Sequence, residues 1–147
     1  MEEGRREKLR PKTRSVPGVP TFARLTVYQR SYQAALELHR ELAGAARKEE
    51  ELVRQLCRAS RSIPANIVEG VNGSNSATET RRFLGMAWRS CDEVWVWLAF
   101  CQDLGLLARE SAAAWEQEYA EIGAMLYRLR QNWTHREDGE APEQSPG

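Results

Sequence analysis

Apolar residues recur at helical spacing in four segments of the chain, and short polar breaks separate these segments. The last segment is the clearest, because its large apolar side chains follow one another at alternating steps of four and three residues. This spacing places them on one face of an amphipathic helix. The stripe consists of Trp115, Tyr119, Ile122, Leu126, Leu129 and Trp133. The pattern predicts a helix from about Ala108 to residue 133.

Two more helices are predicted in the first half of the chain. The first opens at a capping-box sequence, Thr26-Val-Tyr-Gln29, and should end near Gly44. The second begins at about Glu49, in an acidic stretch that suits a helix start, and runs to Gly70. The apolar stripe of the first is predicted to be Tyr28, Tyr32, Ala35, Leu36, His39 and Leu42; that of the second is Leu52, Leu56, Ala59, Ile63 and Ile67.

The third helix has two apolar faces. It begins at the capping box Ser76-Ala-Thr-Glu79 and continues to Gly105; the run 94–100 has strand-like composition, but no Gly or Pro separates it from the helical pattern. At about 100° per residue, Trp88, Trp95, Val96 and Ala99 lie opposite Phe83, Ala87, Val94 and Cys101. One core cannot bury both faces. The second face should therefore meet another subunit or partner, or be covered by loops and tails.

Four helices of similar length, joined by short breaks, bury their stripes most simply as an all-α, antiparallel up-and-down four-helix bundle. The domain is expected over residues 22–133. Residues 1–21 and 134–147 are charged segments containing Pro and Gly, and we expect a disordered basic arm and a disordered acidic tail.

The second helix contains a concentrated departure from helix propensity. Pro64 removes the amide that would bond the carbonyl of Ser60, which costs roughly 3 kcal/mol unless a kink relieves it. Asn66 is expected to bond a carbonyl freed by the proline, Glu69 to pair with an arginine of a neighbouring helix or subunit, and Gly70 to be the left-handed residue that closes the helix. These residues are interpreted as a structural motif. The alternative, a catalytic role for Asn66 and Glu69, would need a second titrating partner.

These segments also resemble a known family in four places. The matching stretches are Leu25-Thr-Val-Tyr-Gln29, Gln55-Leu-Cys-Arg-Ala-Ser-Arg-Ser-Ile-Pro-Ala-Asn-Ile-Val-Glu-Gly70, Phe83-Leu-Gly-Met-Ala-Trp-Arg-Ser-Cys-Asp-Glu-Val94 and Ile122-Gly-Ala-Met-Leu126. Together they resemble the bacterial four-helix bundle proteins encoded in intervening sequences of large-subunit ribosomal RNA, the S23-like family. A distant relative is the accessory variability protein of diversity-generating retroelements. The resemblance implies a ring-like homopentamer, and a nucleic acid or a nucleic-acid enzyme such as a reverse transcriptase as partner.

Charge is balanced overall but unevenly distributed. Basic side chains exceed acidic ones by six in residues 1–48, whereas acidic ones exceed basic ones by three in residues 136–147. This asymmetry either steers partners or keeps the two ends solvated. No secretory signal pattern and no membrane-length apolar run is present in the sequence, so a cytoplasmic location is the expectation. Cys57, Cys91 and Cys101 have no metal-type spacing and should be buried free thiols.

Arginine is the candidate binding chemistry, because the chain has eighteen arginines and three lysines. Arg54, Arg58 and Arg61 form a ridge opposite the apolar stripe of the second helix, and guanidinium groups suit bidentate phosphate contact. Arg81 and Arg82 either extend this surface or pair with Glu69. A solvated face without a ligand is the alternative interpretation.

Enzymatic and metal chemistry is not predicted. Neither histidine follows a glutamate by three residues, as a di-iron bundle requires, and His39 belongs to a predicted core stripe. No cofactor is expected. The sequence predicts a non-enzymatic homo-oligomer, a pentameric ring, that binds RNA or DNA or a nucleic-acid-handling protein. An oligomeric scaffold without nucleic-acid binding is the alternative.

Overall fold

The structure of the protein, a computed structural model, describes residues 21–133. The predicted arm and tail lie outside these residues, except that Thr21 opens a short 3-10 helix. The elements in chain order are η1 (Thr21–Arg24), α2 (Thr26–Leu42), η2 (Ala45–Arg47), α3 (Glu50–Val71), α4 (Ala77–Asp103) and α5 (Arg109–Asn132).

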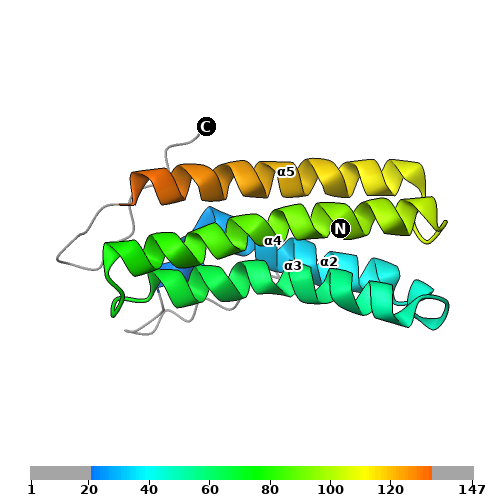
Figure 1. Ribbon diagram of the computed structural model, residues 1–147, viewed down its shortest axis with the longest axis horizontal. Helices are drawn as coiled ribbons and strands as arrows, with labels where there is room; N and C mark the ends of the chain where they lie inside the picture. The colour runs from blue at the N-terminus through cyan, green and yellow to red at the C-terminus, as the bar shows by residue number, and fades with distance from the viewer. Residues whose placement is uncertain (1–20, 134–147) are drawn as a thin grey trace, which may run out of the picture.

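The four α-helices form the predicted antiparallel bundle. Each runs opposite to the one before it, so the start of α2, the end of α3, the start of α4 and the end of α5 meet at one end of the molecule (Figure 1). The helix boundaries agree with the predicted ones to within one or two residues. Residues 94–100 are helical, which settles the strand alternative.

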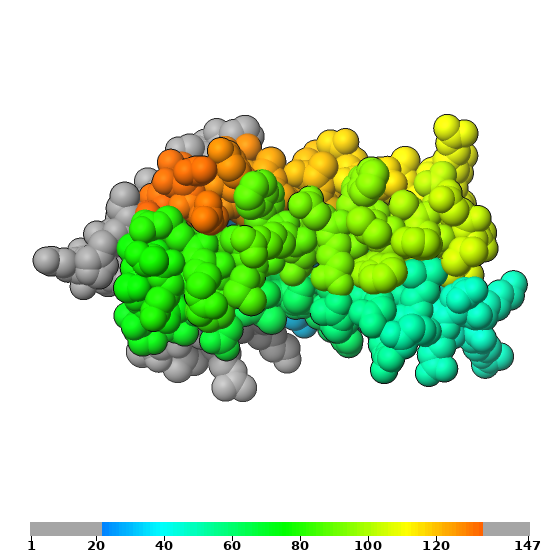
Figure 2. Space-filling view, in the orientation of Figure 1, coloured from blue at the N-terminus to red at the C-terminus, as the bar shows by residue number. Residues whose placement is uncertain are grey.

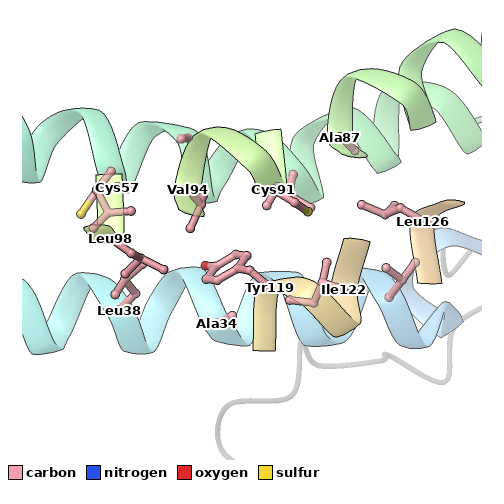
Figure 3. Close-up of a cluster of buried hydrophobic side chains, with 14 of the residues drawn as sticks. Ala34, Leu38, Cys57, Ala87, Cys91, Val94, Leu98, Tyr119, Ile122 and Leu126 are labelled. Carbon is pink, nitrogen blue, oxygen red and sulfur yellow. The ribbon is translucent and has the colours of Figure 1, made fainter. Parts of the chain in front are cut away.

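The core lies along the axis of the bundle and draws on all four helices. Tyr119 of α5 points between α2 and α4, with Leu38, Val94 and Leu98 around it (Figure 3). Leu56 and Ile63 of α3 are fully buried. The predicted stripe of α5 is confirmed, since its four central members are buried and Trp115 and Trp133 pack on the edge of the core.

The predicted apolar stripe of α2 was wrong in its orientation. Tyr32 and His39 are exposed, and Tyr28 is half-buried with its ring against Phe22 at 5.0 Å. The buried residues of α2 are Val27, Ser31, Ala34, Ala35, Leu38 and Leu42. A face turned by about one residue brings the aliphatic side chains to the core. The tyrosines then lie at its margin, where their hydroxyls can reach water.

An ion-pair network joins α2 to α5. The Arg30 guanidinium lies 2.7 Å from one carboxylate oxygen of Glu118 and also pairs with Glu121. The hydrogen bond from Arg30 lowers the pKa of the Glu121 carboxyl below its ordinary value of 4.5. Since the pKa is depressed in the folded state, the stabilisation is present above about pH 4.5 and is lost as the pH falls through the folded value.

We therefore expect Arg30→Gln to lower the melting temperature at pH 7, and the difference from the unmodified chain to shrink progressively as the pH is lowered below about 4.5. Arg54→Gln is the matched control, because Arg54 pairs with Glu51 three residues away in the same helix and ties no second helix to the first. Thermal unfolding followed by circular dichroism at pH 7 and over a series of lower pH values measures this. A fall in melting temperature of equal size at pH 7 and at the lowest pH would contradict the assignment of this stability to the ion pair between Arg30 and Glu121.

Candidate functional site

The outer face of α4 is apolar and open to solvent. Trp88, Trp95 and Val96 are 37%, 53% and 44% exposed, and Ala99 is half-buried. The opposite face, with Ala87, Val94 and Cys101 among its members, is in the core. The two-faced character predicted for this helix is therefore present, and within residues 21–133 no loop covers the second face.

A groove follows this face between α4 and α5. Its volume is about 490 Å³. Figure 2 shows α4 across the middle of the molecule, with α5 above it. Small residues of α5 line it, namely Ala120, Gly123 and Ala124; a Cβ atom on Gly123 would lie 3.7 Å from the Trp88 ring. Tyr127 packs on Trp88 with ring centroids 5.3 Å apart. We call this surface the α4–α5 apolar face; Trp88, Trp95 and Tyr127 are the exposed large side chains that line the groove, and Val96 of α4 is exposed one residue after Trp95.

Sequence reasoning missed the α5 half of this face. Tyr127 follows the buried Leu126 and lies outside the heptad stripe of α5, so the stripe alone gave no reason to select it. The antiparallel pairing of α4 with α5 was the usable signal, because it sets the last turns of α5 beside the first turns of α4.

The predicted arginine ridge is exposed but largely ion-paired. Arg54 pairs with Glu51 of the same helix, and Arg58 reaches across to Glu93 of α4. Arg61 is exposed and has no carboxylate partner among the residues described here. Two of the three charges are therefore offset locally, which weakens the ridge as a phosphate-binding surface.

A second group of arginines lies where α4 begins and α5 ends. Arg81 donates to the backbone carbonyl of Trp133 at 3.0 Å, and Arg130 Nε donates to the backbone carbonyl of Arg81 at 3.1 Å. Arg82 is exposed, with its guanidinium carbon 4.7 Å from the centre of the Phe83 ring. Backbone carbonyls therefore position the guanidinium groups of Arg81 and Arg130, and the Phe83 ring lies beside that of Arg82. Within residues 21–133 none of the three has a carboxylate within salt-bridge distance.

We name Arg81, Arg82 and Arg130 the arginine cluster. Gly85 makes room for it, because a Cβ atom there would lie 3.2 Å from Arg130 Nε. Glu69 takes part in no ion pair within residues 21–133, so the alternative in which Arg81 and Arg82 pair with it is not seen there. The pairing of Glu69 with an arginine of a neighbouring subunit stays a prediction.

The proline segment is structural, although in a different way from that predicted. Pro64 is buried inside α3, which is helical without interruption from Glu50 to Val71. Asn66 Nδ2 donates to the carbonyl of Ser62 at 2.9 Å, four residues earlier, and not to the carbonyl of Ser60 that the proline leaves free. The side chain of Glu69 is exposed, and its backbone carbonyl accepts hydrogen bonds from Asn72 and Asn75.

Gly70 is a close-approach residue and not the left-handed residue that was predicted. It is helical, and the one residue of positive φ in residues 21–133 is Gly105, at +73°. A Cβ atom on Gly70 would lie 2.9 Å from Cβ of Phe83 and 3.3 Å from the carbonyl oxygen of Thr80. The Thr80 hydroxyl donates to the carbonyl of Gly70 at 2.7 Å. The absent side chain therefore lets α4 pack directly on the last turn of α3.

Titratable groups in the core are held in their neutral forms. Cys57, Cys91 and Cys101 are buried and free, as predicted. Burial raises the pKa of Cys91 to about 12 and that of Cys101 to about 11, so neither is a thiolate near neutral pH. Burial also raises the pKa of Tyr119, whose hydroxyl has no hydrogen-bond partner among the described residues. These groups lie inside the bundle, where they pack the core.

Residues 21–133 contain neither a group of metal-ligating side chains nor a helix that could span a membrane. In residues 21–133, no three His, Cys, Asp or Glu side chains are grouped as a metal ion would need them. None of the described helices is both long and apolar enough to cross a membrane.

The chain matches a known protein family and is similar to solved structures. The family model described as 23S rRNA-intervening sequence protein matches residues 23–128. No curated protein matches. The chain is similar to a crystal structure from Bacteroides thetaiotaomicron, described as a protein with unknown function from the S23 ribosomal protein family. The TM-score is 0.66 at 22% identity, over 73% of this chain and 100% of that one, so this likeness shows the fold. The family match spans most of the bundle, and the chain therefore belongs to the 23S rRNA-intervening sequence protein family.

Proposed function

We propose that the protein is a non-catalytic homo-oligomer, a pentameric ring, that binds nucleic acid through repeated arginine surfaces. The α4–α5 apolar face is the observation that carries this proposal. The ligand of the ring is RNA or DNA, which the arginine surfaces bind directly or together with a nucleic-acid-handling protein such as a reverse transcriptase.

The apolar face supports the oligomer because of its size and composition. Of the eight large apolar side chains that are exposed in the described residues, Trp88, Trp95, Val96 and Tyr127 belong to this face. Exposed apolar surface that lines a groove is typical of interaction sites, and aromatic residues are enriched where proteins meet. Most soluble oligomers are closed assemblies of identical chains, so a second copy is the expected occupant of this face.

The arginine cluster supports the nucleic-acid part better than the ridge does. Backbone carbonyls position Arg81 and Arg130, the Phe83 ring lies beside Arg82, and none of the three pairs with a carboxylate of residues 21–133, whereas two ridge arginines are bound to carboxylates. A ring repeats the cluster in every subunit, and the summed charge attracts a polyanion more strongly than one copy does. The family description refers to sequences within 23S rRNA, which agrees with a nucleic-acid context.

Binding to a structured RNA and to a DNA duplex should weaken steeply as salt is raised, because each phosphate contact releases counterions. Replacing Arg81, Arg82 and Arg130 with Gln should lower affinity about tenfold or more at low salt and make the salt dependence shallower. The matched control is the triple Gln variant of Arg54, Arg58 and Arg61, which should lose less. Fluorescence anisotropy over a salt series measures both.

Arg82→Gln alone guards against a folding defect, since Arg81 and Arg130 also tie α4 to α5 through their hydrogen bonds. This single variant should retain the helical circular dichroism and the melting temperature of the unmodified chain, and should still bind less tightly. Absence of any salt-sensitive binding by the unmodified protein would contradict the nucleic-acid proposal.

One observation favours a second candidate function, an oligomeric scaffold that holds a protein partner. The Arg58 to Glu93 pair neutralises the middle of the ridge and joins two helices, as expected of a structural contact. Capture of partners from a native lysate separates the two functions. Capture that nuclease abolishes supports nucleic-acid binding, whereas nuclease-resistant capture supports the scaffold.

A further inference from the structure

We propose that the acidic segment 134–147 of the chain binds its own arginine cluster and competes there with nucleic acid. The proposal joins two features that the function above leaves unused. One is the position at which the described part of the chain ends, and the other is the charge of the residues that follow. Binding of the tail does not require nucleic-acid binding; the competition rests on the proposed function.

The chain leaves the bundle directly beside the cluster. The carbonyl of Trp133, the last residue described, accepts the hydrogen bond from Arg81 at 3.0 Å. Arg130 lies three residues earlier in the chain and donates to the Arg81 carbonyl. The tail therefore begins at the residue directly after Trp133, whose carbonyl positions Arg81.

The tail has the complementary charge. Residues 134–147 contain Glu137, Asp138, Glu140 and Glu143 and one basic residue, Arg136. Carboxylates are good partners for guanidinium groups because the two form parallel hydrogen bonds. No carboxylate of residues 21–133 pairs with the cluster, so these three arginines are open to such a partner.

The acidic residues are within reach. Glu137 follows Trp133 by four residues, which allows at most roughly 14 Å of extended chain at about 3.5 Å per residue. A link of so few residues gives an effective concentration in the millimolar range. A weak ionic contact is then substantially occupied within the molecule, although the same peptide added in solution would scarcely bind. The proposed pairing of tail carboxylates with the arginine cluster is between surface charges, so added salt should screen and weaken it.

The basic arm, residues 1–20, is the rival partner for the tail. It contains six basic and three acidic side chains and is followed in the chain by η1, which leads into the start of α2. The start of α2 lies at the end of the bundle where α5 ends (Figure 1). The cluster is the better partner, because hydrogen bonds already position two of its guanidinium groups, those of Arg81 and Arg130, which therefore lose less freedom on pairing.

Arginine footprinting of the full chain tests the proposal. Phenylglyoxal modification is followed by mass spectrometry in the unmodified protein and in a variant with Glu137, Glu140 and Glu143 changed to Gln and Asp138 to Asn. At low salt, Arg81, Arg82 and Arg130 should react about threefold or more slowly in the unmodified chain, and the difference should vanish at about 1 M salt. Arg40 and Arg109, which are exposed at the opposite end of the bundle, serve as references and should react equally in both proteins.

Equal rates at the cluster in the two proteins would overturn the proposal, and so would protection found at Arg5, Arg6, Arg10 and Arg14 of the arm instead. The nucleic-acid assay is a separate measurement, in which the neutralised tail should tighten binding about threefold or more at low salt. Cluster protection together with no nucleic-acid binding by either protein would refute the proposed function and leave the tail contact standing. Binding that is unchanged by neutralising the tail would refute the competition.

Discussion

Val96→Arg should convert the proposed oligomer into a folded monomer. Val96 is 44% exposed on the α4–α5 apolar face, so a longer side chain there meets solvent in the single chain and disturbs no core contact. Within an assembly the same position would bury an unpaired charge against aromatic side chains. Leaving a charge buried without a partner costs about 3–5 kcal/mol, which is enough to dissociate an interface of ordinary affinity.

Gln33→Arg is the matched control for this variant, because it adds the same charge at an exposed position of α2. It should leave the mass of the assembly unchanged. Light scattering measures both variants, and circular dichroism should show that both keep the helical content of the unmodified chain. Dissociation by both variants, or by neither, would mean that this face is not the subunit contact.

Gly70→Ala should lower the free energy of unfolding more than alanine at any other helical glycine of residues 21–133. The added Cβ atom would lie 2.9 Å from Cβ of Phe83 and close to a backbone oxygen, so neither neighbour is the free end of a flexible side chain. Overpacking of this kind costs about 1–3 kcal/mol. The better helix propensity of alanine returns up to about 1 kcal/mol of that.

The net loss in Gly70→Ala should therefore reach about 2 kcal/mol, which lowers the melting temperature by up to several degrees for a domain of this size. Gly44→Ala is the control, because a Cβ atom at Gly44 has nothing within 4 Å and its φ is −71°. That variant should be neutral or slightly stabilised. Thermal and urea unfolding compare the two, and equal stability of both variants would show that α3 and α4 do not depend on a bare backbone at Gly70.

The arrangement of the helices was predictable because their signals are local. Ser76 accepts a hydrogen bond from the Glu79 amide, as its capping-box sequence indicated, and the heptad of α5 is the buried stripe that was expected. The orientation of α2 was not predictable by the same means. Its tyrosines and its aliphatic residues both recur at helical spacing, and only packing against the other helices decides which set is buried.

The roles within the proline segment depended on contacts between distant residues. Whether Gly70 provides a positive φ or a close approach is decided by Phe83 and Thr80 of the next helix, and nothing near Gly70 in the chain indicates which. Arg130 likewise joins the candidate surface only because α5 returns antiparallel to α4. The neutralisation of Arg58 by Glu93 is a contact of the same type, between residues 35 positions apart.

The mass of the unmodified protein in solution tests the central claim, that the α4–α5 apolar face is a contact between identical chains. Multi-angle light scattering at micromolar concentration should give a multiple of the 16.8 kDa chain mass, five times that value for a pentameric ring. A single species at 16.8 kDa over the whole concentration range would contradict it.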